Sequence, residues 1–203
     1  MKHAVILAHP NPDSISGQIA EAYARAASSL GQEVVVRDLY WMDFDPRLRA
    51  EETVLPYGSV ARPDVIRERK LLAGVDVFAF VYPLWFNAPP AILKGYVDRV
   101  FSSGFGFESD GRGGTSGLLD GKRLISFSTS GAPDSWINDT GAVAALTNAF
   151  DRHVAAVCGM SVVDHVNFGG VVPGITKEAV ADILAKVQVT VRKAFDPAAT
   201  IVA

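Results

Sequence analysis

The sequence is poor in cysteine, with Cys158 as the single example among 203 residues. One cysteine cannot form an internal disulfide, and it cannot supply a cysteine-cluster metal site. Cys158 stands in the run Ala155-Ala156-Val157-Cys158, which resembles a helix face. We therefore expect its thiol to be a small buried hydrophobic group.

An excess of charge of one sign is also missing. The formal net charge is −3, and the lysines and arginines are scattered among acidic residues. Nucleic-acid-binding domains usually carry a clustered basic surface, so we expect no nucleic-acid partner. His153 and His165 have no partners at metal-ligand spacing; we expect two structural histidines and no metal site.

Long hydrophobic runs are missing as well. The apolar run after Met1-Lys2-His3 stops at His9-Pro10, which is too short for a signal-peptide core, and no stretch has membrane-spanning length. We therefore expect no membrane insertion and a cytoplasmic protein. The G-x-G-x-x-G and G-x-S-x-G motifs are also absent, so neither a static dinucleotide site nor a hydrolase nucleophile is supported.

Segments of strand and helix character alternate along the chain. Strands are predicted at His3–Ala8, Glu33–Asp38, Val75–Val81, Lys122–Thr129 and Met160–Val166, and helices at Ile15–Leu30, Asp64–Gly74, Pro89–Phe101, Gly141–Cys158 and Thr176–Phe195. This alternation predicts a parallel sheet with helices on both faces. We expect one α/β domain over residues 1–203: a flavodoxin-like, doubly wound five-stranded sheet of order 2-1-3-4-5.

The segment from Tyr82 to Phe101 is the most informative part of the chain. A buried strand breaks into an aromatic loop with Trp85 and Phe86, and paired prolines then stand where we expect the first turn of a helix. Ligands of open parallel sheets bind at the carboxyl ends of strands, where the winding direction changes. The two aromatic residues are therefore placed to lie against a flat ring.

This segment resembles the signature loop of the flavin-dependent NAD(P)H:quinone oxidoreductases of the DT-diaphorase type. The loop at His9, the arm Asp38–Pro46 and the loop at Thr129 also match that family, in the same order. The resemblance implies a ping-pong enzyme that transfers a hydride from NAD(P)H to bound FAD, with FMN possible, and then to a quinone or similar acceptor. It also implies a homodimer built by the arm and the loop 102–121.

The loop from His9 to Ser16 precedes a predicted helix, and a helix N-terminus favours a phosphate. The alternative is that Ser14 only caps the helix and His9 only completes a turn. The resemblance implies a set of cofactor-binding residues: His9, Ser14 and Ser16 at the phosphates; Pro83, Leu84, Trp85 and Phe86 against the ring; and Asn87, Thr129, Ser130 and Gly131 through the backbone.

Phe107 and Trp136 are the candidates for lining the reaction pocket. Trp136 stands where the family has a tyrosine, and no histidine follows it, so the family's Tyr-His proton relay does not carry over. Phe107 stands where a tyrosine is common and is expected to reach the partner subunit's site; the alternative is that it packs under the glycine-rich loop. Likewise Trp41, Met42 and Phe44 form either a small buried cluster or an interface.

Two other function classes stay open at this point. The first alternative is a non-catalytic flavoprotein that regulates a partner, like the family's ancillary subunits of potassium-efflux systems. The second is a flavodoxin-type electron carrier, although a net charge of −3 is mild for a carrier. The pair Asp98-Arg99 stands where FAD-binding relatives have Glu-Arg, which favours FAD over FMN. The run Arg67-Glu68-Arg69-Lys70 is expected to be a solvated helix face.

Overall fold

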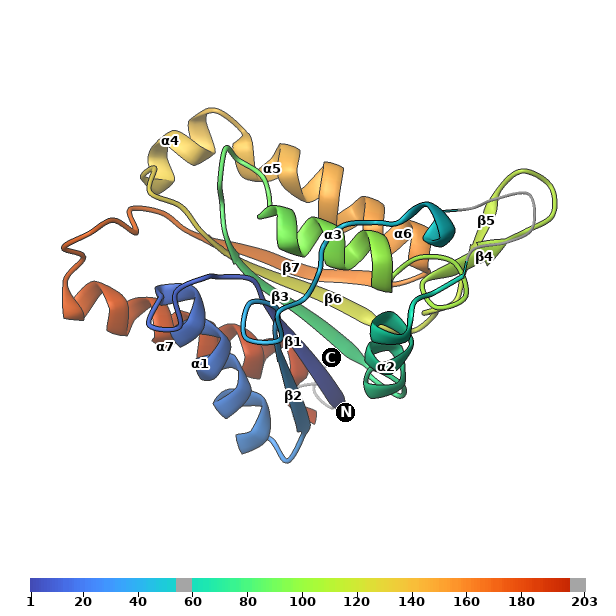
Figure 1. Ribbon diagram of the computed structural model, residues 1–203. Coiled ribbons are helices and arrows are strands. Elements are labelled where there is room, and N and C mark those ends of the chain that lie inside the picture. The colour runs from blue at the N-terminus through green and yellow to red at the C-terminus, as the bar shows by residue number, and fades with distance from the viewer. Residues whose placement is uncertain (54–59, 198–203) are drawn as a thin grey trace.

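A five-stranded parallel sheet forms the centre of the computed structural model, which describes residues 1–53 and 60–197 (Figure 1). The strands lie in the order β2-β1-β3-β6-β7, and all neighbours are parallel. Their bounds are β1 Lys2–Leu7, β2 Glu33–Asp38, β3 Val77–Pro83, β6 Arg123–Thr129 and β7 Ser161–Phe168. Since β6 and β7 are the fourth and fifth strands of the sheet, the predicted order 2-1-3-4-5 is confirmed.

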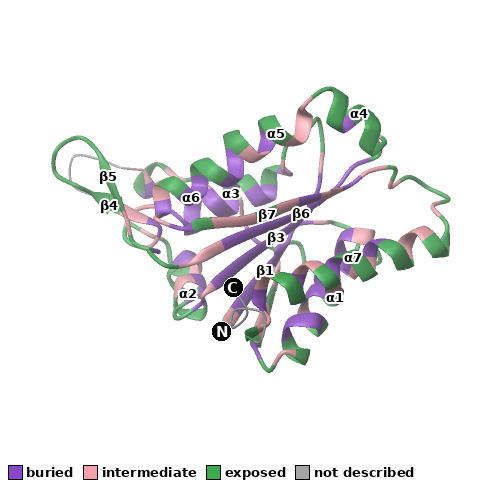
Figure 2. Cartoon of the chain, turned by 180° about the vertical axis from the view of Figure 1, so that it is seen from behind, coloured by how far each residue is buried: buried purple, intermediate pink, exposed green. Residues whose placement is uncertain are grey.

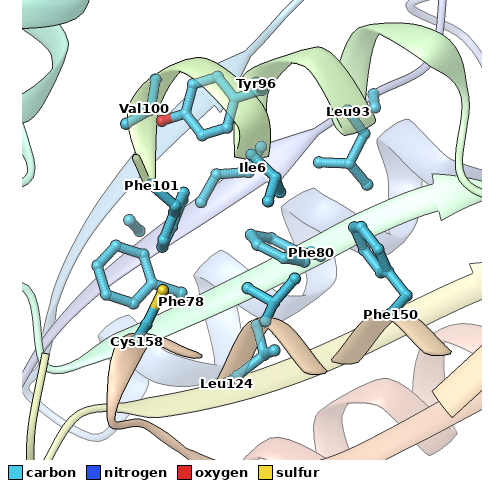
Figure 3. Packing of buried hydrophobic residues seen from close by; sticks show 14 of the residues in the cluster. Ile6, Phe78, Phe80, Leu93, Tyr96, Val100, Phe101, Leu124, Phe150 and Cys158 are labelled. Atoms are coloured by element: carbon cyan, nitrogen blue, oxygen red, sulfur yellow. The ribbon is translucent and has the colours of Figure 1, made fainter. Parts of the chain in front are cut away.

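Helices cover both faces of the sheet (Figures 1 and 2). One face is covered by α1 (Ile15–Ser29) and α7 (Lys177–Phe195), and the other by α3 (Ala91–Val100), α5 (Ala142–Leu146) and α6 (His153–Cys158), with α2 (Pro63–Leu71) beside α3. All seven residues of β3 are buried, as expected for a central strand covered on both faces. Phe78 and Phe80 pack towards α3 (Figure 3). Val77 and Ala79 point to the opposite face of the sheet and pack towards α1 and α7.

Several predicted boundaries differ from the structure. The helix expected from Pro89 begins at Ala91, because Pro90 is the extended N-cap residue (φ −55°, ψ 149°). The helix expected over Gly141–Cys158 is divided into α5, a π-helical turn η2 (Thr147–Arg152) and α6. The sequence did not indicate α4 (Asp134–Asp139), the 3₁₀ turn η1 (Ala50–Glu52) or the small antiparallel hairpin of β4 (Phe107–Ser109) and β5 (Thr115–Gly117).

Arg99 fixes the arm after β2 to the body of the protein. Its buried guanidinium donates to both carboxylate oxygens of Glu52 at 2.9–3.0 Å, to the carboxylate of Asp64 at 2.8 and 3.1 Å, and to the carbonyl of Asp45 at 2.6 Å. Bidentate arginine–carboxylate pairs are strong and directional. Arg99 therefore holds the segment after β2 in place and does not contact the carboxyl ends of the strands. Residues 54–59 of the connection between β2 and α2 lie outside the described ranges.

The aromatic residues of the arm have separate environments. Phe44 is buried, and its ring lies 5.2 Å from that of Tyr96. Trp41, in contrast, is 89% exposed. The buried-cluster alternative therefore describes Phe44 but not Trp41.

The helix α2 corrects the expectation of a solvated charged face. Glu68 is buried; its carboxylate accepts from Arg37 at 2.6 and 2.9 Å and from the Tyr96 hydroxyl at 2.7 Å. Arg69 donates to three carbonyls at the end of α3 and to the Ser102 hydroxyl. The sequence did not predict the buried pairing of Glu68 and Arg69, because a run of four charged residues is usually exposed.

Candidate functional site at the carboxyl edge

Three loops meet where β1, β3 and β6 end, and we call residues 8–14, 84–90 and 130–133 the carboxyl-edge loops. The Ala8 N–H donates to the Val81 carbonyl at 2.9 Å, and the Leu84 N–H donates to the Thr129 carbonyl at 2.7 Å. The imidazole of His9 lies 6.3 Å from the Trp85 ring, measured between centroids. The structure thus brings the three predicted cofactor loops together, as expected for the carboxyl ends of neighbouring parallel strands.

The N-terminus of α1 faces this edge. The Ser14 hydroxyl accepts from the Gly17 N–H at 3.0 Å, so the predicted cap is present. The buried Ser16 hydroxyl lies 3.4 Å from that of Thr129. Among the described residues, the N–H groups of Ile15 and Ser16 have no protein acceptor. These two donors and the positive end of the helix can hold an anionic group.

His9 is oriented by its own loop. Its Nδ1 lies 3.0 Å from the Asn11 backbone nitrogen and 3.2 Å from the Asn11 carbonyl oxygen. In the tautomer in which Nδ1 accepts from the Asn11 N–H, Nε2 carries the ring hydrogen. Partial burial lowers the pKa of His9 from its usual value of 6.5. The imidazole at this edge is therefore neutral at pH 7 and can donate one hydrogen bond.

The aromatic loop is a tight turn that presents its rings outwards. Phe86 and Asn87 both have positive φ (52° and 55°), and Trp85 and Ala88 exchange two backbone hydrogen bonds of 3.1 Å. Positive φ at both central residues is unfavourable for a bulky side chain such as phenylalanine. Phe86 is fully exposed and Trp85 is 44% exposed, whereas Pro83 is buried and Leu84 packs against the core. Among the predicted ring-packing residues, Trp85 and Phe86 are thus exposed, Leu84 is partly buried and Pro83 is buried.

The loop after β6 has one open backbone donor among its predicted contacts. The Ser130 N–H donates to the Phe168 carbonyl at 2.9 Å, and the Thr129 carbonyl accepts from Leu84. The exposed Gly131 has no protein acceptor for its N–H within the described part of the chain. The Gly131 N–H can thus donate to a ligand, whereas the Ser130 N–H is already used within the protein.

The helix α4, which carries Trp136, and the strand β4, which carries Phe107, lie at opposite ends of the molecule (Figure 1). Trp136 is on α4, which follows the loop after β6, and is 47% exposed. Phe107 is on β4, where it lines an apolar cavity of about 400 Å³ beside α3 and α6, together with Phe101, Val157 and Cys158. Within one chain, the structure does not bring Phe107 to the carboxyl edge.

Sequence reasoning missed a buried polar chain beneath this edge. His165 contacts Asp151 of η2 through Nδ1 and Ser128 of β6 through Nε2 (2.9 Å). A signal was present: Ser126 and Ser128 lie on one face of the predicted strand Lys122–Thr129, Ser130 directly follows that strand, and buried hydroxyls need partners. Asp151 could not be found in this way, because the π-helical turn decides which face of its helix it occupies.

Residues 1–53 and 60–197 contain neither a candidate metal centre nor a candidate membrane span. No three His, Cys, Asp or Glu side chains lie together in a way that could hold a metal ion. No helix in these ranges combines the length and the apolar character needed to cross a membrane.

Comparison with known proteins agrees with this geometry. A family model described as "Flavodoxin-like fold" matches residues 1–191. The chain is 34% identical over 172 residues to a Haemophilus influenzae protein named "Uncharacterized NAD(P)H oxidoreductase", covering 84% of this chain and 85% of that protein. It is 31% identical over 152 residues to "Ribosyldihydronicotinamide dehydrogenase [quinone]" of Rattus norvegicus, covering 66% of each chain.

A solved structure gives the same result. The NAD(P)H:quinone oxidoreductase from Methanothermobacter marburgensis superposes with a TM-score of 0.82 at 27% identity, over 95% of each chain. The matched residues include β1, β3 and β6 and the three loops that follow them. The chain therefore belongs to the family with the flavodoxin-like fold and, within it, to the NAD(P)H:quinone oxidoreductases, a group of oxidoreductase enzymes.

Proposed function

We propose that the chain binds a flavin at the carboxyl-edge loops and catalyses hydride transfer from NAD(P)H to a quinone or similar acceptor. The observation that carries this proposal is the meeting of an open helix N-terminus, an outward-facing aromatic turn and the open Gly131 N–H at one edge of the sheet. These groups fit the anionic tail, the flat ring and the polar ring edge of a flavin. When bound, a flavin supplies the chemistry of accepting and returning a hydride.

The residues of the chain have separate tasks in this proposal. The N–H groups of Ile15 and Ser16 bind the phosphate, and His9 Nε2 donates a hydrogen bond beside them. Trp85 and Phe86 pack against the ring and exclude water from it. The Gly131 N–H faces the ring edge, where a backbone donor stabilises developing negative charge without reorganisation.

The structure removes the reason for favouring FAD over FMN. That preference rested on the pair Asp98-Arg99, which stands where FAD-binding relatives have Glu-Arg, and the Arg99 guanidinium is buried among Glu52, Asp64 and the Asp45 carbonyl. An arginine held there does not reach the carboxyl edge. We propose a flavin that is either FAD or FMN.

We further propose that the active species is a homodimer. Phe107 lines an apolar cavity beside β4, and β4 lies far from the carboxyl-edge loops of its own chain. Phe107 can therefore line a reaction pocket only at the carboxyl edge of a second copy of the chain. Mixing Phe107→Ala protein with a His9→Ala, Ser14→Ala double variant tests this proposal. A shared site predicts partial recovery of activity in the mixed dimers, and no recovery would contradict it.

Steady-state kinetics test the reaction. Because NAD(P)H and the acceptor take turns at one edge, oxidation of NAD(P)H with menadione should give parallel double-reciprocal lines, the pattern of a ping-pong enzyme. Intersecting lines would show both substrates bound at once and would contradict a shared pocket. No flavin-dependent oxidation of NADH or NADPH with any quinone would contradict the proposed activity itself.

A further inference from the structure

A buried chain of hydrogen bonds runs from η2 to the loop after β6, and we call Asp151, His165 and Ser128 the buried triad. Asp151 is fully buried, and the His165 side chain is only 2% exposed. The Ser126 hydroxyl donates to Asp151 Oδ1 at 2.8 Å, and His165 Nδ1 contacts Asp151 Oδ2. On the other side of the ring, His165 Nε2 lies 2.9 Å from the Ser128 hydroxyl.

Asn167 continues this chain to the carboxyl edge. Its Oδ1 accepts from the Ser128 hydroxyl at 2.9 Å, and its Nδ2 donates to the Ser130 hydroxyl at 3.2 Å and to Asp134 Oδ1 at 3.4 Å. The same Asp134 oxygen accepts from the Gly169 N–H at 2.8 Å, and Asp134 begins α4. The chain therefore reaches both ends of the loop that carries Gly131 and leads to Trp136.

The donors and acceptors can be assigned along the chain. A carboxylate only accepts, so Asp134 fixes the Asn167 amide with Nδ2 towards it and Oδ1 towards Ser128. The single hydroxyl hydrogen of Ser128 then goes to Asn167, and the Ser128 oxygen must accept from His165 Nε2. Because Asp151 also accepts, the geometry gives His165 a hydrogen on both ring nitrogens.

This direction of donation distinguishes the buried triad from a hydrolase triad. In a hydrolase, the histidine accepts from the serine and activates it as a nucleophile. Here the histidine donates, and Ser128 is completely buried with its hydrogen given to Asn167. A positioning role fits this geometry and a nucleophilic role does not.

The surroundings of His165 contain further titratable groups. The Tyr82 ring of β3 stands edge-on at 6.3 Å, and burial together with the Asp151 charge raises its pKa well above 10, so it keeps its proton. The carboxylate of Asp164, the preceding residue on β7, accepts from the His165 backbone N–H at 2.8 Å. Asp134 and Lys186 line a neighbouring cavity of about 370 Å³, and His165 also contributes to its wall.

We propose that the buried triad, acting through Asn167, positions the loop after β6 for ligand contact. This inference rests on the proposed flavin site, because a loop held at both ends keeps the Gly131 N–H aimed before the ligand arrives. A preorganised donor avoids the cost of ordering the loop on binding. The buried triad thus belongs to the site although none of its members faces the ligand.

Two serines of β6 provide a matched test. Ser128→Ala cuts the chain between His165 and Asn167, whereas Ser126→Ala removes an equal buried hydroxyl that donates to the far side of Asp151. In FMN and FAD titrations we expect Ser128→Ala to weaken affinity about tenfold, Ser126→Ala to stay within about twofold of the parent, and Ser128→Thr to restore binding. Equal effects of the two alanine variants, or none from Ser128→Ala, would overturn the inference.

A second measurement needs no flavin. In ¹⁵N-histidine NMR spectra of the full chain at neutral pH, one of the four histidines should show hydrogens on both ring nitrogens, and this signal should be missing in His165→Gln. A His165 ring with one hydrogen would contradict the assigned chain. If the parent binds neither flavin while the NMR signal is present, the proposed function fails and the hydrogen-bond assignment stands.

Discussion

The carboxyl edge and the arm differ in how their polar groups are paired. At the arm, the buried guanidinium of Arg99 donates to Glu52, Asp64 and the Asp45 carbonyl, so these polar groups are already paired within the chain. At the carboxyl edge, N–H groups of α1 have no acceptor among the described residues and two aromatic rings face outwards. The arm thus contributes to stability, while the edge keeps its interactions for a ligand. Substitutions in the arm should therefore lower the stability of the fold, whereas substitutions at the carboxyl edge should weaken ligand binding.

The largest expected effect is on the arm. Arg99→Met leaves the buried carboxylate of Glu52 without its partner, and breaking a buried ion pair from one side costs about 3–5 kcal/mol. Urea unfolding should show this loss. The control is Lys94→Met on the same helix, whose pair with Asp98 is exposed and should contribute little. Equal stability of the two variants would contradict the role given to Arg99.

A pH effect of similar size is expected from the closed core. Burial lowers the pKa of His3 from 6.5 to about 4. Between these values the unfolded chain binds a proton that the folded chain does not. The free energy of unfolding should therefore rise by about 3 kcal/mol as the pH is raised from 4 to 6.5. Unfolding curves at several pH values should show this slope in the exposed-site control His153→Gln but not in His3→Gln. An unchanged slope in His3→Gln would refute the assignment.

Alanine substitutions at two glycines, one packed against the arm and one at the carboxyl edge, compare the two regions directly. A Cβ at Gly95 of α3 would lie 2.1 Å from the Pro46 carbonyl oxygen of the arm, so Gly95→Ala must displace the arm, at a cost of about 1–3 kcal/mol. A Cβ at Gly131 would meet only ordinary contacts, the nearest being Val172 at 3.7 Å. Thermal unfolding should therefore separate Gly95→Ala from Gly131→Ala. Similar melting temperatures would mean that the arm is not packed as described.

The smallest effect on folding is expected at the edge itself. His9 is partly exposed and bonds only within its own loop, so His9→Ala should leave the unfolding curve nearly unchanged. Flavin affinity should still fall roughly ten- to a hundredfold, as for loss of one hydrogen bond to a charged phosphate. Equilibrium dialysis with each flavin measures this. If affinity is unchanged and stability falls, the loop is only a helix cap.

The fold was predictable from the sequence because its signals are local. Alternating strands and helices gave the order of the sheet, and the polar loop before Ile15 gave the cap by Ser14. The prolines misplaced the start of α3 by only two residues, since the restriction that Pro90 imposes acts on its neighbours.

The partners across the fold were not predictable. Arg99 is separated from Glu52 by 47 residues, and no local pattern distinguishes it from a solvated arginine. Asp151 reaches His165 only because η2 interrupts the expected helix. The separation of Phe107 from the carboxyl edge depends on where α3 ends and the β4–β5 hairpin begins. Contacts of this kind require the three-dimensional arrangement.

The most direct test of the account is a flavin titration followed by tryptophan fluorescence. The chain has three tryptophans: Trp85 and Trp136 beside the carboxyl edge and Trp41 on the arm. We expect FMN or FAD to bind with a Kd on the order of 10 μM or tighter and to quench the emission, with much less quenching in Trp85→Leu and no difference in Trp41→Leu. Absence of saturable binding by both flavins, or quenching that depends on Trp41 and not on Trp85, would contradict a flavin site at the carboxyl edge.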